Sequence, residues 1–170
     1  KFDVITDKFE KPVDLIFNLA CPASPPLYQK HALFTLDTCF LGTKAVLDYA
    51  VESGATVVHA STSEIYGDPL IHPQTEDYYG NVNTLGIRSC YDEGKRISET
   101  LCFEYANQFS LDIKIARIFN TYGPRMSLND GRVITNFIKS FMNNEELTIF
   151  GQGQQTRSFC FISDLLSGLI

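Results

Sequence analysis

Val13–Ala20, with the sequence VDLIFNLA, is a short apolar run rich in residues that favour β-strands. Such a run is typical of a strand buried on both faces, as the strands of a parallel sheet are. Two further runs have the same character, Val57–Ser61 (VVHAS) and Ile113–Phe119 (IKIARIF), and Leu147–Phe150 predicts one more short strand. The chain therefore offers several strands for one buried sheet.

Helical periodicity separates these strands. Apolar residues recur on one face of Ala32–Ser53, which Gly54 is expected to end, and further helices are predicted over Arg88–Phe109 and Val133–Met142. Ser163 is the expected cap of a last helix. Strands that alternate with helices predict an α/β fold with a parallel sheet flanked by helices.

Two connections lack this regularity. The segment Cys21–Pro26, CPASPP, contains three prolines and is predicted to continue neither a strand nor a helix. Thr62–Ile87 is long and rich in Gly, Pro, Asn and Asp, which is typical of a functional or a disordered loop. Its tyrosine and isoleucine content favours an ordered, functional loop.

Composition excludes several classes of function. The 170 residues suit a single domain, and the net charge of −6 argues against binding nucleic acid or an anionic membrane. The basic residues gather after residue 87, a pattern that suits a small anionic ligand. Five cysteines without a CxxC pair indicate reduced, mostly buried thiols, and no metal site is expected because the histidines show no ligand-like spacing with them.

Tyr91 and Lys95 are the first candidates for chemistry. Their i, i+4 spacing places both side chains on one face of the predicted helix. A neighbouring ammonium lowers the pKa of a phenol, so such a pair can take a proton from an alcohol while a hydride leaves its carbon. An exposed helical pair without function is the alternative interpretation of this spacing.

Ser61–Glu64, STSE, follows a predicted parallel strand at the sheet edge where α/β proteins bind ligands. A threonine hydroxyl there can hydrogen-bond a reacting hydroxyl, and a carboxylate can lie near a sugar. A helix or turn cap is the alternative interpretation of this tetrapeptide.

Seven segments together resemble the UDP-glucuronate decarboxylase (UDP-xylose synthase) family of extended short-chain dehydrogenases. They occur in the order NLACPASPP, ASTSEIYGDP, HPQTEDYYGNVN, GIRSCYDEGKR, ARIFNTYGPRM, NDGRVITNFI and GQGQQTRSFCFISDL, and they cover nearly all of the chain. The resemblance implies a Rossmann-type sheet that binds NAD, with a UDP-sugar above it. It implies a partial NAD-binding domain over about residues 1–125, running into the start of a sugar-nucleotide-binding region over about residues 126–170.

The resemblance also implies roles for the catalytic residues. Tyr91 would remove the proton from the sugar C4 hydroxyl, Lys95 would hold the nicotinamide ribose and tune Tyr91, and Thr62 would orient the hydroxyl. The resulting 4-ketone is β to the carboxylate at C6, which is then lost as CO₂. Glu64 would assist the steps at C5, whereas related 4,6-dehydratases carry an aspartic acid where Ser63 stands here.

Binding residues follow by the same resemblance. The implied cofactor-binding residues, besides Tyr91 and Lys95, are Leu19, Ala20, Cys21, Thr38, Ala60, Thr121 and Arg132. Asn120, Arg157 and Ser63 are the implied substrate-binding residues, with Arg157 on the diphosphate. For Arg117 and Arg125, a role as ordinary surface or ion-pair residues remains an open interpretation.

The sequence departs from that family at two places. No glycine-rich GxxGxxG turn for the pyrophosphate occurs, and the part that closes over the sugar is not recognised, so we expect an incomplete fold without its first βαβ unit and C-terminal substrate lobe, cut from a longer protein. In Thr35–Thr43, Asp37 replaces a basic residue of the relatives and Cys39 replaces an asparagine, which puts the cofactor geometry in doubt.

The sequence thus predicts a lyase that converts UDP-glucuronate to UDP-xylose with NAD. Two alternatives remain open: a 4,6-dehydratase or 4-epimerase of the same fold, and a truncated, inactive homologue. A homodimer through the helix that carries Tyr91, with Ile97, Leu101 and Phe103 available, is expected from the family. The reduced cysteines favour the cytoplasm, and the Golgi lumen is the alternative if the parent protein carries an N-terminal membrane anchor.

Overall fold

The computed structural model describes residues 2–149 and 151–170. Its main sheet has three parallel strands in the order β1 (Leu15–Asn18), β2 (Thr56–Thr62) and β3 (Ile113–Ile118). A second parallel sheet pairs β4 (Asn120–Tyr122) with β5 (Phe159–Phe161). The predicted α/β architecture with a parallel sheet is confirmed.

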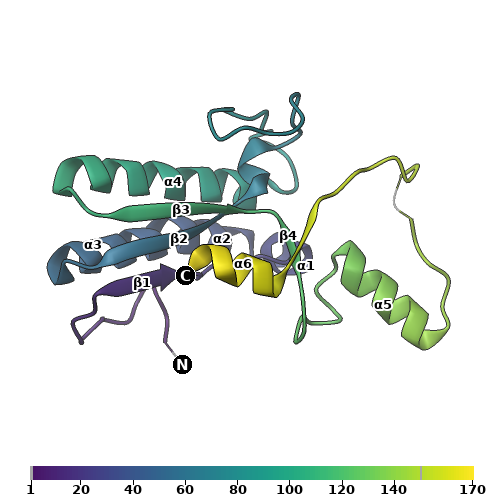
Figure 1. Ribbon diagram of the computed structural model, residues 1–170, viewed down its shortest axis with the longest axis horizontal. Coiled ribbons are helices and arrows are strands. Elements are labelled where there is room, and N and C mark those ends of the chain that lie inside the picture. The colour runs from purple at the N-terminus through teal and green to yellow at the C-terminus, as the bar shows by residue number, and fades with distance from the viewer. Residues whose placement is uncertain (1, 150) are drawn as a thin grey trace.

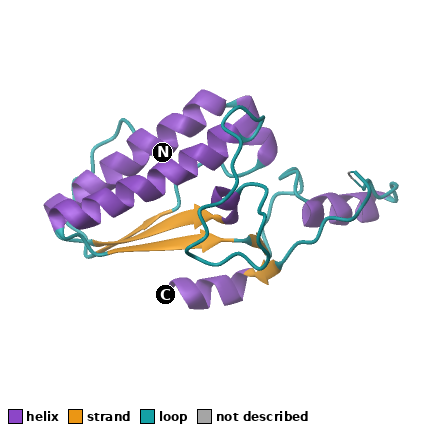
Figure 2. Cartoon of the chain, turned by 90° about the horizontal axis from the view of Figure 1, so that it is seen from above, coloured by secondary structure: helices purple, strands orange, loops and turns teal. Residues whose placement is uncertain are grey.

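Helical segments connect the strands. They are α1 (Pro25–Lys30), α2 (Ala32–Asp37), the π-helical turn η1 (Thr38–Gly42), α3 (Thr43–Ser53), the 3₁₀ turn η2 (Ser63–Tyr66), α4 (Ser89–Phe109), α5 (Val133–Asn143) and α6 (Ile162–Leu169). Helices α2, α3 and α4 lie on one side of the main sheet, as seen in Figure 2, and α6 lies on the other. Helix α5 stands apart from the sheet (Figure 1).

The core lies between the main sheet and helices α3 and α4. Its central cluster consists of Val46, Leu47, Ala50, Val57 and Cys102, each at most 3% exposed. The α3 members recur at i, i+1 and i+4, so they share one face of the helix. Burial of these side chains is the main force that holds α3 and α4 on the sheet.

The long helix predicted over Ala32–Ser53 is helical throughout but is interrupted by the π turn η1. The carbonyl of Cys39 in this turn accepts a hydrogen bond from the buried Ser98 hydroxyl of α4 at 2.8 Å. Gly94 of α4 makes room for the turn, since a Cβ there would lie 3.0 Å from Cys39 Sγ. The periodicity of the sequence does not reveal this π turn, because the turn depends on the packing of α4.

Two local predictions were wrong. Pro25 and Pro26 do not exclude a helix but begin α1, because the first turn of a helix leaves its N–H groups unpaired and tolerates proline there. Ser163 is not the cap of the last helix: α6 begins at Ile162, and its N-cap position is Phe161.

The second sheet was also not predicted correctly. Leu147–Ile149 forms no strand, and the remaining residue of that predicted strand, residue 150, lies outside the described residues. Strands β4 and β5 form instead, in the register Asn120↔Phe159 and Tyr122↔Phe161. These strands are too short for a periodic signal, and each exists through its pairing with the other.

The long loop after β2 is ordered, as predicted. Gly67 pairs with Asn81, and the Arg96 guanidinium donates to the carbonyls of Ile65 at 2.9 Å and Tyr79 at 2.8 Å. Gly67 has φ +64°, and a Cβ there would lie 2.1 Å from the Asn81 carbonyl oxygen, so this crossing of two backbone segments requires glycine.

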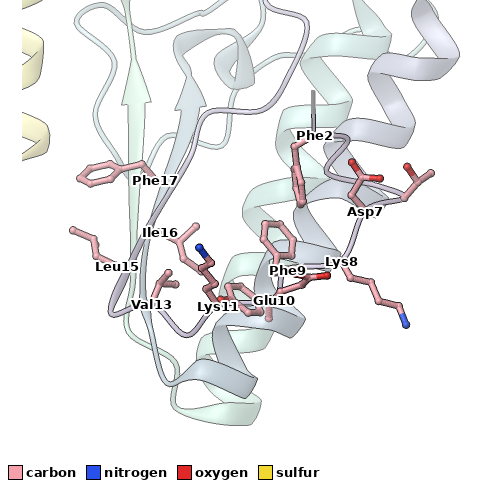
Figure 3. A pocket seen from close by; sticks show the side chains of 12 residues that line it. Phe2, Asp7, Lys8, Phe9, Glu10, Lys11, Val13, Leu15, Ile16 and Phe17 are labelled. Atoms are coloured by element: carbon pink, nitrogen blue, oxygen red, sulfur yellow. The ribbon is translucent and has the colours of Figure 1, made fainter.

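The N-terminal segment packs beside β1. The Phe9 ring stacks on Tyr49 of α3, with ring centroids 4.7 Å apart, and Phe2 lies against Phe9. Figure 3 shows these rings lining a hollow with Ile16, while Leu15 and Phe17 point to the opposite side of β1. None of the 12 residues drawn in Figure 3 belongs to the predicted catalytic or binding set.

Candidate active site

Tyr91 and Lys95 lie in the first two turns of α4 and are both buried, at 7% and 5% exposure. The Lys95 ammonium donates a hydrogen bond to the Ala60 carbonyl on β2, at 2.8 Å, and lies 6.0 Å from the centroid of the Tyr91 ring. The i, i+4 pair therefore faces the main sheet near the carboxyl end of β2. A solvent-exposed helical pair, the alternative drawn from the sequence, is excluded.

Thr62, the last residue of β2, lies close enough to the Tyr91 phenol to influence its pKa. Burial raises the pKa of Tyr91 above its ordinary value, and the Thr62 side chain offsets this only in part. The net shift is upward because burial dominates, and the Lys95 ammonium, which donates to the Ala60 carbonyl, does not reverse it. Tyr91 is thus a neutral phenol at neutral pH.

Glu64 lies in η2, directly after β2. Thr62 caps this turn, since its hydroxyl accepts a hydrogen bond from the Glu64 amide at 3.2 Å, so STSE is a cap as well as part of the site. The Glu64 carboxylate forms an ion pair with Arg88 at the start of α4. Its charge also raises the pKa of Tyr91, which places the carboxylate within electrostatic reach of the phenol.

The loop after β1, which carries Leu19, Ala20 and Cys21, approaches the pair at Lys95. Leu19 is 62% exposed, and the Ala20 amide donates to the Asn18 side chain at 3.3 Å. Cys21 lies near Lys95, whose positive charge lowers the pKa of the thiol, although the hydrogen bond with Cys39 has the larger effect. Thr38 is buried and donates to the Phe34 carbonyl of its own helical segment at 2.7 Å, an internal contact.

The two arginines predicted in the second half of the chain, Arg132 and Arg157, have different surroundings. Arg132 is paired with Asp130, which raises the arginine pKa despite burial, and Tyr91 adds a smaller effect in the same direction. Arg132 therefore lies within electrostatic reach of Tyr91. Arg157 is exposed and donates to the Thr156 carbonyl at 2.7 Å.

Asn120 and Thr121 are half-buried on β4. Among the described residues, no hydrogen bond joins Asn120, Thr121 or Arg157 to Tyr91. The structure thus brings Thr62, Glu64 and Ala60 to the Tyr91–Lys95 pair.

Several residues of the site were not predicted. Tyr28 of α1 stacks on Tyr91, with centroids 4.9 Å apart and rings 11° from parallel. Arg88, noted in the sequence only for its charge, holds Glu64. No local pattern marks Tyr28, because its partner lies far away along the chain; a helix predicted at Pro25 would have drawn attention to it.

The ambiguity at Arg117 is also resolved. Its guanidinium pairs with Glu99 of α4 at 2.9 Å and donates to the Tyr66 hydroxyl at 2.9 Å. It is therefore an ion-pair residue that ties β3 to α4 and to η2. Arg125 is exposed and has φ +69°.

The donor set fits the nicotinamide-ribose half of a dinucleotide. Within the described residues, the buried Lys95 ammonium has one protein acceptor, the Ala60 carbonyl, and an ammonium has three N–H donors. The spare donors suit ribose hydroxyls. For a metal the finding differs: the described residues contain no group of three or more His, Cys, Asp or Glu side chains that could hold an ion.

A parallel sheet flanked by helices, with a buried tyrosine–lysine pair and a threonine at its carboxyl edge, places this chain in the Rossmann-type class of folds. The chain belongs to the NAD dependent epimerase/dehydratase family, whose sequence model matches residues 2–170. Within the same ranges that the structure describes, no helix combines the length and the apolar character needed to cross a membrane.

Particular relatives are more specific. The chain is 52% identical to UDP-glucuronic acid decarboxylase 6 of Arabidopsis thaliana, over 100% of this chain and 51% of that protein. It is also 52% identical to UDP-glucuronic acid decarboxylase 1 of Xenopus tropicalis, over 93% of this chain and 38% of that protein. The chain thus spans about half of the first relative and less than half of the second.

Solved structures show the same fold. UDP-glucuronic acid 4-epimerase from Bacillus cereus in complex with NAD has a TM-score of 0.84 at 28% identity, over 98% of this chain and 52% of that one. dTDP-glucose 4,6-dehydratase from Streptomyces venezuelae, with NAD bound, has a TM-score of 0.81 at 28% identity, over 92% and 47%. The Rossmann-type sheet predicted by resemblance is confirmed.

Proposed function

We propose that the full-length gene product that carries these 170 residues decarboxylates UDP-glucuronate to UDP-xylose with NAD as its cofactor. The observation that carries the proposal is the buried Tyr91–Lys95 pair with Thr62 near the phenol, in a chain 52% identical to named UDP-glucuronic acid decarboxylases. Residues of about 1–125 would hold the cofactor, and residues of about 126–170 would begin the sugar-nucleotide site.

Tyr91 acts as the base at the sugar C4 hydroxyl. Only the phenolate can act as this base, so the phenol proton must first leave to solvent; burial makes that loss costly, and the nearby Lys95 ammonium favours the anion. The phenolate oxygen then takes the proton of the C4 hydroxyl as the C4–H bond breaks. NAD, when bound, accepts a hydride from the sugar carbon and later returns it. The positive charge of Lys95 stabilises the Tyr91 phenolate, and its remaining N–H donors would hold the ribose hydroxyls of the cofactor.

Loss of CO₂ then needs little from the protein. With a ketone at C4, the C5–C6 bond breaks, the electron pair is delocalised onto the ketone as an enolate, and a proton returns to C5. Glu64 assists the steps at C5, and the ion pair with Arg88 fixes the direction of its carboxylate. Ser63 supplies no acid for the elimination of water, which favours decarboxylation over dehydration.

The substrate diphosphate is the proposed ligand of Arg157, and the sugar that of Asn120. Arg157 is exposed, and its guanidinium is held by one main-chain acceptor, so it is available to a phosphate. The pyrophosphate of NAD would need a glycine-rich turn, which these 170 residues do not contain.

The test is a reaction of the full-length gene product with NAD⁺ and UDP-glucuronate, followed by mass spectrometry of the sugar nucleotide. We expect loss of the mass of CO₂, and incorporation of one deuterium at C5 when the reaction is run in D₂O. Tyr91→Phe should lower the turnover rate by about 10²-fold or more, the usual contribution of a positioned acid–base group. Tyr79→Phe, on a side chain that is 89% exposed, is the matched control.

The alternatives give different results in that assay. A product of unchanged mass that separates from UDP-glucuronate by chromatography would establish a 4-epimerase. Unchanged substrate with NAD bound would direct the search to 4,6-dehydratase substrates. Unchanged substrate without NAD binding would establish an inactive homologue.

A homodimer through α4 is proposed as well. Ile97 and Phe103 are 39% and 61% exposed on this helix, whereas Leu101 is partly buried against the core. Phe103→Glu should convert a dimer to a monomer in analytical ultracentrifugation. A monomeric wild-type protein at micromolar concentration would refute the dimer.

We further propose the cytoplasm as the compartment, because all five cysteines are free. Fractionation of the native cells, with an antibody to the gene product, tests this. Recovery in the Golgi lumen would support the alternative.

A further inference from the structure

Two cysteines from separate segments meet beside the Tyr91–Lys95 pair. Cys21, in the loop after β1, has its Sγ 3.4 Å from the Sγ of Cys39 in the π turn η1. Cys39 is 1% exposed, and Cys21 is partly exposed.

The position of Cys39 is firmly set by α4. Its carbonyl accepts the Ser98 hydroxyl at 2.8 Å, and its side chain fills the space left by Gly94. A disulfide has an S–S distance of about 2.05 Å, so the sulfurs must approach by about 1.4 Å from their present 3.4 Å separation. Because Cys39 is fixed, the loop that carries Cys21 makes most of this movement.

We propose that Cys21 and Cys39 form a thiol-oxidation site, which a peroxide or a small-molecule disulfide converts to an intramolecular disulfide. With hydrogen peroxide, the Cys21 sulfur attacks one oxygen, and a sulfenic acid and water result. The Cys39 sulfur then attacks the sulfenic sulfur, the S–S bond forms and a second water leaves. Two thiols are oxidised by two electrons in total, and one peroxide is reduced to two waters.

The two thiols have different roles in this sequence. The hydrogen bond with Cys39 lowers the pKa of Cys21, and the Lys95 ammonium lowers it further, against the effect of burial. The same hydrogen bond and burial raise the pKa of Cys39. Cys21, which is also the more exposed, is therefore the attacking thiol, and Cys39 resolves the sulfenic acid.

A third thiol provides an internal comparison. Cys90 lies near enough for its charge to raise the pKa of Cys21, but its Sγ donates to the Tyr28 carbonyl at 3.6 Å. Selective pairing of Cys21 with Cys39 is thus a specific expectation among three neighbouring cysteines.

The experiment is a peptide map of the full-length gene product. The reduced protein is exposed to a small excess of hydrogen peroxide, free thiols are blocked with N-ethylmaleimide, and the protein is digested with trypsin without reductant. The three thiols fall in different tryptic peptides, 9–30, 31–44 and 89–95. We expect peptides 9–30 and 31–44 to be joined, with loss of two hydrogen atoms, and to separate after treatment with dithiothreitol.

Variants sharpen the result. Cys39→Ser should abolish the link and leave a Cys21 sulfenic acid that dimedone traps, while Cys160→Ser, on β5, should leave the link unchanged. Full alkylation of both thiols after peroxide, a link between peptides 9–30 and 89–95, or sulfinic acid without a link would each overturn the proposal.

The disulfide has a consequence that rests on the proposed function. It would draw the loop with Leu19 and Ala20 toward η1 and so displace residues proposed to line the cofactor. NAD binding should weaken by about tenfold on oxidation, which is 1.4 kcal/mol, and recover with dithiothreitol. If the reduced protein binds no NAD, the proposed function fails while the peptide map still decides the thiol site; a linked protein with unchanged affinity would refute this consequence.

Discussion

Asp92 should make the fold less stable at neutral pH than at acidic pH. It follows Tyr91 on α4, and its Oδ1 atom is buried without a hydrogen-bond partner among the described residues. Burial raises the pKa of this carboxyl from 3.8 to about 6, against the lowering effect of Arg88. The folded state therefore binds this proton more tightly than the unfolded state does.

The sign and size of the effect follow from these values. The stability that the protonated carboxyl contributes is fully present below pH 3.8 and is lost as the pH rises through about 6. At 1.36 kcal/mol per pKa unit the difference corresponds to about 3 kcal/mol. Partial solvent exposure and the favourable position of an acid in the first helical turn reduce this, so we expect about 1.5 kcal/mol.

Asp92→Asn removes the titration and keeps the shape. The variant should be more stable than the wild type by about 1.5 kcal/mol at pH 8, and the difference should shrink toward zero near pH 4. Urea unfolding, followed by circular dichroism at intervals of half a pH unit, measures the difference. A constant difference across this range, or a loss of stability at pH 8, would refute the assignment of a raised pKa.

Asp48→Asn is the matched control with the opposite sign. Burial raises the pKa of Asp48, but hydrogen bonds from Lys44 and Tyr105 outweigh it and lower the pKa below its ordinary value. The contribution of Asp48 is present above its unfolded pKa and is lost as the pH falls through the folded value. Asp48→Asn should therefore destabilise the protein at pH 8, and the effect should fade in acid.

Three further substitutions test the core, the π turn and the site. Leu47→Ala, at a fully buried position, should cost about 2–5 kcal/mol in urea unfolding, and a cost below 1 kcal/mol would contradict the core described above. Ser98→Ala leaves the Cys39 carbonyl without this donor and should cost about 1–3 kcal/mol by the same measurement, whereas Ser53→Ala, near the helix end, should change little. Arg88→Gln and Glu64→Gln break the same ion pair, so their effects on kcat should be non-additive in the double variant. Additive effects would show that the two residues act independently.

Much of the α/β layout was accessible from local patterns. The apolar runs at β1, β2 and β3 and the helical periodicity of α4 were predicted within a few residues, because the burial of a strand or helix face leaves a period in the sequence. The i, i+4 spacing of Tyr91 and Lys95 likewise placed both on one face, since helix geometry alone decides it. The prolines of Cys21–Pro26 were, by contrast, wrongly taken to exclude a helix, and α1 begins at Pro25.

The surroundings of these residues were decided by contacts between distant segments. Only packing shows that Tyr28 stacks on Tyr91, that Arg88 holds Glu64 and that Cys21 meets Cys39. The pKa of Tyr91 is a further case: the sequence predicts the ammonium beside the phenol, but its hydrogen bond to Ala60 and the burial of the ring depend on β2 and α1.

The division has one physical reason. Which face of an element is apolar is set by neighbours along the chain, and the sequence alone determined it for α4 and the Tyr91–Lys95 pair, whereas strands predicted to be buried on both faces leave Leu15 and Phe17 of β1 49% and 41% exposed. Which elements then meet is set by the free energy of packing whole surfaces together, a property of the folded chain. Tertiary structure therefore decided the π turn, the pairing of β4 with β5, the neutral state of the Tyr91 phenol and the meeting of the two thiols.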